Sequence, residues 1–159
     1  MSIRIAMISC QNVKDDCSCG SAGCMSAFDT RTKSFERYKD EDVHLVGYNS
    51  CAGCPTLYAY DKILKRVKPL VEFAHADKIH FSSCMMKMCP FVQKYKKVIE
   101  ETYPQVEVIL GTDANEGDPL DVMPDMFHRL LTDTDGDITD EFNALMAKAK
   151  AAAAAQAQQ

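Results

Sequence analysis

The sequence has few glycines and prolines and no long hydrophobic run. Seven glycines and six prolines in 159 residues exclude collagen-like and Pro/Gly-rich disordered chains, and a hydrophobic fraction of 47% is typical of a chain with a folded core. No stretch approaches the roughly 18 consecutive apolar residues of a membrane span, and Arg4 interrupts the apolar amino-terminal stretch. We therefore expect no membrane segment, no signal peptide and a cytoplasmic location.

Positive charge is scarce toward the carboxyl end. Residues 113–141 contain ten acidic residues and a single basic one, Arg129, so this segment carries a net charge of -9 within a chain whose total is -5. Affinity for nucleic acid requires a basic face that neutralises phosphates. The charge distribution therefore argues against a nucleic acid partner.

Cysteine is abundant, with eight residues that all precede position 90. Because no export signal is recognised, we expect a reducing compartment, where cysteines are more often metal ligands or redox thiols than a disulfide framework. The length suits one globular domain with a tail. We predict a Cys-rich α/β domain over residues 1–112 and an acidic, helical, partly disordered extension over residues 113–159.

Hydrophobic periodicity alternates along the first part of the chain. Short β-branched segments predict four strands, at Ile3–Ser9, Val43–Asn49, Lys78–Ser83 and Val106–Leu110. Helical spacing predicts intervening helices over 25–38, 57–71 and 91–102, and further helices over 122–131 and 138–155 in the extension. Alternating strands and helices imply a parallel sheet covered on both faces. The expected fold is a small three-layer α/β sandwich, flavodoxin-like or doubly wound, with a helical carboxyl-terminal extension.

The cysteines fall where the predicted strands end. Cys10 follows the first strand, Cys51 and Cys54 follow the second, and Cys84 and Cys89 follow the third. Since the carboxyl ends of parallel strands share one rim of a sheet, where open α/β folds place ligands, these thiols are expected to converge. The loop after the first strand can bring three more thiols over the same rim, those of Cys17, Cys19 and Cys24.

Two of these junctions share a pattern in which a strand is followed by Ser-Cys, a spacer and Cys-Pro. Proline is favoured at the first position of a helix, so the pattern predicts that Cys54 and Cys89 cap the helices that follow them. The positive end of a helix dipole lowers thiol pKa values and stabilises thiolates or an anionic cluster. Cys10 could instead be a small buried hydrophobe, and Cys17 and Cys19 could be spare thiols or a disulfide pair.

Together these motifs resemble the CGGC domain proteins, small cysteine-rich proteins found mainly in anaerobic prokaryotes. The resemblance covers residues 3–113 and includes the opening strand ending in Cys10, the segment Cys51-Ala-Gly-Cys54-Pro, and the closing Gly111-Thr-Asp. It implies metal binding, with zinc as the metal usually proposed. The chain departs from the family pattern at Phe91 and Asp113, where members often have histidine, which argues against mixed Cys/His ligation.

The ligands favour iron–sulfur chemistry over zinc. All-thiolate sites suit either, but this domain has its own core and does not need zinc to fold, and Cys-Pro recurs at cluster ligands in ferredoxins. The leading hypothesis is therefore an electron-transfer or redox-sensing protein with iron–sulfur clusters of the [4Fe–4S] type and a redox partner protein. Two alternatives stay open, a zinc-binding structural module and a thiol–disulfide oxidoreductase using Cys51 and Cys54. The oligomeric state is not predicted.

Eight thiols match two four-cysteine sites, although sharing across the rim is equally compatible with the sequence. One partition assigns four metal ligands to each site: Cys51, Cys54, Cys84 and Cys89 to the first, and Cys10, Cys17, Cys19 and Cys24 to the second.

Overall fold

The computed structural model of the chain describes residues 2–54, 58–114 and 137–156, and residues 122, 123, 126 and 129. The chain divides into two compact units, Met1–Ala114 and Asn115–Gln159. The first unit contains the sheet and all eight cysteines. No helix within the described ranges is both long enough and apolar enough to cross a membrane.

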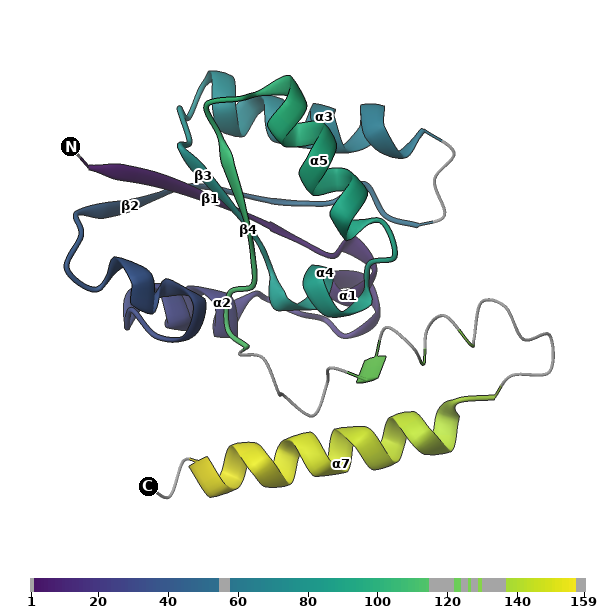
Figure 1. Cartoon of the computed structure of the whole chain (residues 1–159). Helices are drawn as coiled ribbons and strands as arrows, with labels where there is room; N and C mark the ends of the chain where they lie inside the picture. Colours follow the sequence, from purple (N-terminus) through teal and green to yellow (C-terminus); the bar gives the residue numbers. More distant parts are fainter. Residues whose placement is uncertain are drawn as a thin grey trace. The chain divides into compact units, whose positions relative to one another are not determined.

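The first unit is built on a parallel sheet of four strands in the order β2-β1-β3-β4. The strands are β1 (Ile3–Ser9), β2 (Val43–Ser50), β3 (Lys78–Phe81) and β4 (Glu107–Leu110). In Figure 1 they run in one direction, so that all carboxyl ends lie on the same side of the unit. β1 and β3 occupy the centre because each has a neighbour on both sides.

Helices cover both faces of this sheet, which confirms the predicted flavodoxin-like α/β fold. α3 (Ala59–Glu72) and α5 (Val92–Thr102) lie on one face, and α2 (Ala22–Asp29) with the 3-10 helix η1 (Lys33–Tyr38) lies on the other (Figure 1). Two short helices, α1 (Gln11–Asp16) and α4 (Ser83–Met88), directly follow β1 and β3. Both therefore lie at the carboxyl rim of the sheet.

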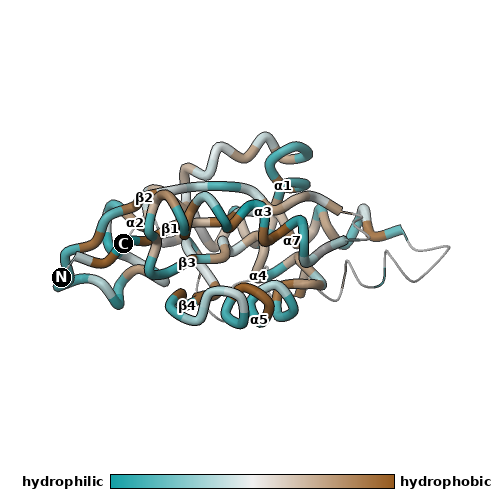
Figure 2. The backbone as a smooth tube through the Cα atoms, turned by 90° about the horizontal axis from the view of Figure 1, so that it is seen from above, coloured by the Kyte–Doolittle hydropathy of each residue, from teal (hydrophilic) through white to brown (hydrophobic). Residues whose placement is uncertain are grey.

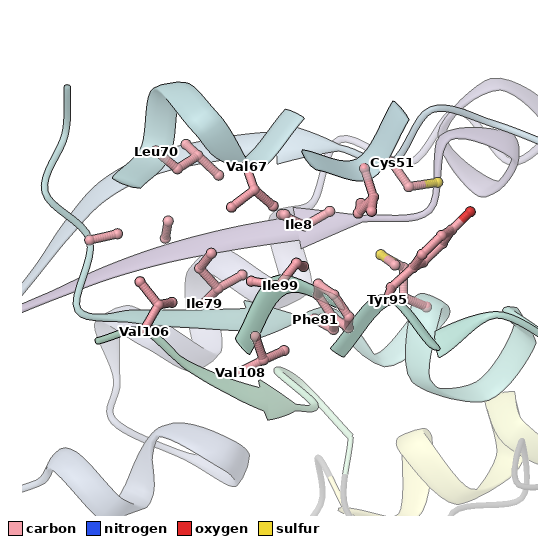
Figure 3. Close-up of a cluster of buried hydrophobic side chains, with 14 of the residues drawn as sticks. Ile8, Cys51, Val67, Leu70, Ile79, Phe81, Tyr95, Ile99, Val106 and Val108 are labelled. Atoms are coloured by element: carbon pink, nitrogen blue, oxygen red, sulfur yellow. The ribbon is translucent and has the colours of Figure 1, made fainter. Parts of the chain in front are cut away.

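Alternation along β1 divides the core into two layers. Ala6 and Ile8 face α3 and α5, where they pack in a cluster that includes Ile79 and Phe81 of β3 (Figure 3). Ile5 and Met7 face the opposite side and pack in a second cluster. All four β1 side chains are fully buried. Both faces of β1 are therefore apolar, as expected for a central strand of a parallel sheet.

The helices that cover the first cluster are amphipathic. Figure 2 shows hydrophobic and hydrophilic residues side by side along α3 and α5. On α3, Ile63, Val67 and Leu70 are buried at helical spacing, and on α5 Tyr95 and Ile99 are buried. The apolar faces therefore meet the sheet and leave the charged faces exposed.

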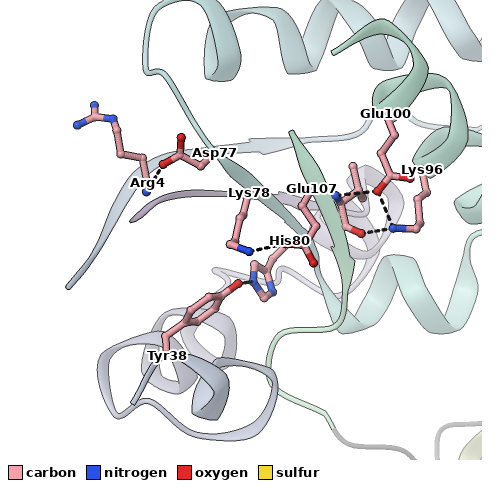
Figure 4. A network of polar contacts seen from close by, with 9 residues as sticks. Arg4, Tyr38, Asp77, Lys78, His80, Lys96, Glu100 and Glu107 are labelled. Carbon is pink, nitrogen blue, oxygen red and sulfur yellow. Dashed lines mark hydrogen bonds and ion pairs between the residues drawn. The ribbon is translucent and has the colours of Figure 1, made fainter. Parts of the chain in front are cut away.

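The second face holds a buried polar group, His80 on β3. Its side chain is fully buried, and its Nδ1 lies 2.9 Å from the Gly111 carbonyl oxygen, which can only accept a hydrogen bond. Nδ1–H therefore donates to that carbonyl, and the neutral ring accepts at Nε2 from the Tyr38 hydroxyl at 2.9 Å (Figure 4). Burial lowers the pKa of His80 to about 4.

The helix predicted over residues 25–38 is wrong as a single element. α2 ends at Asp29, and η1 begins four residues later at Lys33. Arg31 and Lys33 have φ values of 53° and 57°, which lie in the left-handed region and cannot continue an α-helix. The polar helix α1 was not predicted.

The second unit contains α7 (Thr139–Gln156), which confirms the helix predicted over 138–155. Arg129 forms an ion pair with Glu141 of this helix. Most of the helix predicted over 122–131 lies outside the described residues.

Candidate metal centre at the carboxyl rim

The strand order places three cysteines side by side at the rim. Cys51 follows β2, Cys10 follows β1, and Cys84 is the second residue of α4, which follows β3. Because β1 lies between β2 and β3, Cys10 lies between the other two. Segments that are 40 and 74 residues apart in sequence therefore meet here.

The Cys84 sulfur has hydrogen-bond partners at the end of β1 and at the end of β3. The backbone N–H of Cys10 donates to Cys84 Sγ at 3.3 Å, and Ser82 Oγ lies 3.0 Å from the same sulfur. Both interactions favour a thiolate at this position, although burial dominates and raises the pKa of the Cys84 thiol. A bound metal would supply a positive charge that stabilises the thiolate in place of the water lost on burial.

Cys51 and Cys10 form a thiol pair of unequal acidity. The neighbouring Cys10 thiol lowers the pKa of Cys51, and backbone N–H groups of Gln11 and Gly53 act in the same direction. The Gln11 N–H lies 3.3 Å from Cys51 Sγ. The pKa of Cys10 is raised, first by its hydrogen bond to Cys51 and then by burial. Cys51 is therefore the more acidic thiol of the pair.

Cys54 and Cys89 complete the group of thiols on this side. Burial, together with the charges of Cys51, Cys54 and Cys84, raises the pKa of the Cys89 thiol to about 12. Burial and the charge of Cys51 likewise raise the pKa of Cys54. The ring of Tyr95 lies at the same end of the core as Cys51 (Figure 3), and its pKa is raised by burial and by the charges of Cys89, Cys54 and Cys51. These residues are therefore near neighbours.

The predicted helix caps are wrong for both Cys54 and Cys89. α3 begins at Ala59 after Tyr58, and α5 begins at Val92 after Phe91. Cys89 instead ends α4, where its N–H bonds the Met85 carbonyl at 3.0 Å and its backbone is extended. Proline disfavours helical backbone in the residue before it, so the Cys-Pro pair makes a turn between two helices.

Cys24 lies on the other side of the rim, beside the end of β4. It is buried on α2, with its sulfur 3.1 Å from Thr112 Oγ1 and 3.8 Å from Asp113 Oδ1. Burial, together with the charges of Asp113, Cys84 and Cys19, raises the pKa of Cys24 to about 12. Cys84 therefore contacts Cys10 on one side, and on the other its charge raises the pKa of Cys24.

The remaining loop cysteines differ in position. Cys19 is half-buried, and its charge influences Cys24 and Cys84. Cys17 is exposed and ends α1. The contacts therefore group Cys10 with Cys51 and Cys84 rather than with Cys17, Cys19 and Cys24.

Several polar residues that the sequence did not single out shape this rim. Gln11 accepts a hydrogen bond from Ser50 Oγ, and Asn12 Oδ1 lies 3.4 Å from the Cys54 N–H. Ser83 Oγ lies 3.0 to 3.3 Å from three successive backbone N–H groups, those of residues 112–114. The only sequence signal for Ser83 was its place directly before Cys84 at a strand end.

The donor set suits soft metals. Thiolates bind zinc and iron–sulfur clusters, and backbone N–H donors to sulfur stabilise the charge that such ligands carry. Across the part of the chain that the structure describes, no three Cys, His, Asp or Glu side chains form a group that could hold a metal ion as they lie. The thiols therefore fit a metal by their chemistry and by their place at adjacent strand ends, and binding would require their side chains to move closer together.

The fold and this rim define a cysteine-rich α/β protein with a flavodoxin-like parallel sheet and clustered thiols. The CGGC domain matches residues 4–113, and the chain belongs to this family. It is 32% identical over 118 residues to an uncharacterized protein of Methanocaldococcus jannaschii, a match that covers 69% of this chain and 86% of that protein. No solved structure matches the chain.

Proposed function

We propose that this protein binds metal through the cysteines of the rim, and that the metal is an iron–sulfur cluster used in electron transfer or redox sensing. The observation that supports this proposal best is the meeting of Cys51, Cys10 and Cys84 at the ends of three adjacent strands. A bound cluster would supply a one-electron redox couple.

The protein's own groups would hold the cluster and neutralise its charge. Cys89 feels the charges of Cys51, Cys54 and Cys84, which all raise the pKa of its thiol. N–H groups of Gln11 and Cys10 donate to the sulfurs of Cys51 and Cys84. Hydrogen bonds to cluster sulfurs are one of the means by which proteins set a reduction potential.

An iron–sulfur cluster is favoured over structural zinc because the fold does not need a metal. Structural zinc is typical of small modules that lack a core. Here two apolar clusters pack against the two faces of the sheet, and Ile8 and Met7, one from each, are fully buried. We therefore expect the metal-free domain to fold and the metal to serve function.

The test is a metal and acid-labile sulfide analysis, with a visible spectrum, on protein purified without oxygen. We expect iron and sulfide in equal amounts and an absorption band near roughly 400 nm. Cys84→Ser and Cys51→Ser should each lose most of the iron. Cys17→Ser is the matched control, because Cys17 is exposed at the end of α1, and it should keep the iron. Zinc without sulfide would contradict the cluster and support a zinc module.

A further inference from the structure

Cys10 and Cys51 directly follow two paired residues at the ends of neighbouring strands. Ser9 of β1 pairs with Ser50 of β2 in the parallel register, and the Cys51 N–H bonds the Ser9 carbonyl at 2.8 Å. Cys10 and Cys51 are the first residues after these two strand ends. Adjacent strands lie about 4.8 Å apart, and a disulfide requires Cα atoms about 4.4–6.8 Å apart. The spacing of the strands that lead into this pair therefore lies within the range that a disulfide requires.

The two side chains also point to the same face. Successive residues of a strand alternate between faces, so Cys10 follows Ala6 and Ile8 toward α3 and α5. Cys51 belongs to the core cluster on that face, and Cys10 packs against this cluster. Each thiol is the largest influence on the pKa of the other, which raises the pKa of Cys10 and lowers that of Cys51, as expected of neighbouring sulfurs. Orientation and contact thus agree with the strand spacing.

An accessible thiol lies beside this pair. Cys51 is only 5% exposed, whereas Cys54, three residues later, is exposed. Gly53 between them has φ of 81°, a left-handed turn conformation. An external disulfide would therefore meet Cys54 first and reach the buried pair through it.

We propose that Cys10 and Cys51 form a reversible disulfide across β1 and β2, made by exchange with a low-molecular-weight disulfide that enters at Cys54. In the first step Cys54, after losing its proton, attacks one sulfur of the external disulfide and releases one thiol. Cys51 then attacks the Cys54 sulfur and releases the second thiol. In the last step Cys10 attacks Cys51, and its proton returns to Cys54. One external disulfide is reduced to two thiols, and Cys10 and Cys51 together lose two electrons.

This disulfide goes beyond the proposed cluster, because its formation requires no metal. One consequence does rest on the proposed function: the bond would occupy two of the candidate ligands, so that the rim could accept a cluster only after reduction. The oxidised bond would then regulate metal loading at the same site.

The experiment uses the full-length, reduced, chelator-treated protein incubated with oxidised glutathione without oxygen. Remaining thiols are alkylated, and the linked peptides are identified by mass spectrometry. We expect the peptides that contain Cys10 and Cys51 to be linked in the final product. A final product linked between Cys51 and Cys54, or free alkylated Cys10 and Cys51, would overturn the proposal.

Variants test the route. In Cys10→Ser the exchange should stop at a Cys51–Cys54 bond, whereas Cys54→Ser should give the same final bond as the wild type about tenfold more slowly or slower still. Cys17→Ser removes another exposed thiol and should leave the rate unchanged. An unchanged rate in Cys54→Ser would show that the external disulfide does not react first with Cys54. Circular dichroism verifies that each variant folds, and the wild-type mapping decides the proposal without any variant.

The disulfide and the proposed iron–sulfur cluster are tested by separate measurements. Mapping on metal-free protein tests the disulfide, and iron and sulfide analysis tests the proposed function. A Cys10–Cys51 bond in a protein that never binds iron would refute only the cluster.

Discussion

Acidification should destabilise the fold through His80. This side chain is fully buried between the sheet and η1, with both ring nitrogens hydrogen-bonded in the neutral form. Folding lowers its pKa from 6.5 to about 4. Because the unfolded chain binds the proton first as the pH falls, the stabilisation is complete above pH 6.5 and is lost between pH 6.5 and about 4.

The size of the effect follows from the difference in pKa. Each pH unit in that range removes about 1.4 kcal/mol from the free energy of unfolding. Over the whole range from pH 6.5 to about 4, the loss amounts to about 3 kcal/mol. Such a loss is a large fraction of the roughly 5–15 kcal/mol that stabilises a typical domain.

Urea denaturation at a series of pH values measures this dependence. His80→Gln keeps an amide that can donate and accept hydrogen bonds but cannot titrate, so its stability should fall less steeply between pH 6.5 and 4. His44→Gln is the control, because the His44 side chain on β2 is 59% exposed, and it should keep the wild-type slope. Equal slopes for wild type and His80→Gln would refute the argument.

Three further predictions concern the fold. Gly111→Ala should destabilise the protein by about 1–3 kcal/mol in urea denaturation, because φ is 107° and a Cβ would lie 2.6 Å from Ser34 Oγ; an unchanged midpoint would contradict this strain. Ile8→Ala should cost about 2–5 kcal/mol, since Ile8 is fully buried between α3 and α5, and a smaller loss would mean that the core collapses around it. A chain ending at Ala114 should unfold cooperatively and keep the metal content of the full chain, as measured by thermal melting and iron analysis, and loss of either would show that residues 115–159 support the first unit.

The fold was predictable where the hydrophobic pattern of a segment points to a single secondary structure. β1 spans Ile3–Ser9 as predicted, because a central strand is apolar on both faces and polar residues bound it. The irregular segment after α2 was not predictable, because the break depends on the left-handed backbone of Arg31, a residue type without a turn preference. α1 was missed because it buries no residue and shows no apolar periodicity.

The candidate site was predictable only in part. The sequence indicates that thiols after parallel strands meet at one rim, and the structure brings Cys10, Cys51 and Cys84 together there. It does not indicate strand order, so it cannot show that Cys10 lies in the middle or that Cys10 and Cys51 follow paired residues of neighbouring strands. The role of Cys89 was misjudged because a proline after cysteine suits either a helix start or an interhelical turn.

The central position of Cys10 has a consequence for how the protein matures. The Cys10 backbone meets the sulfur of Cys84, a residue 74 positions later, so the thiol rim exists only after β3 and α4 have joined β1. Such long-range contacts form late, because the entropy of closing a long loop must first be overcome. The rim thus differs from the ligand set of a zinc finger, which comes together only when the metal binds. During synthesis the early cysteines stay without their partners, and loading of the rim becomes a separate step that follows completion of the sheet.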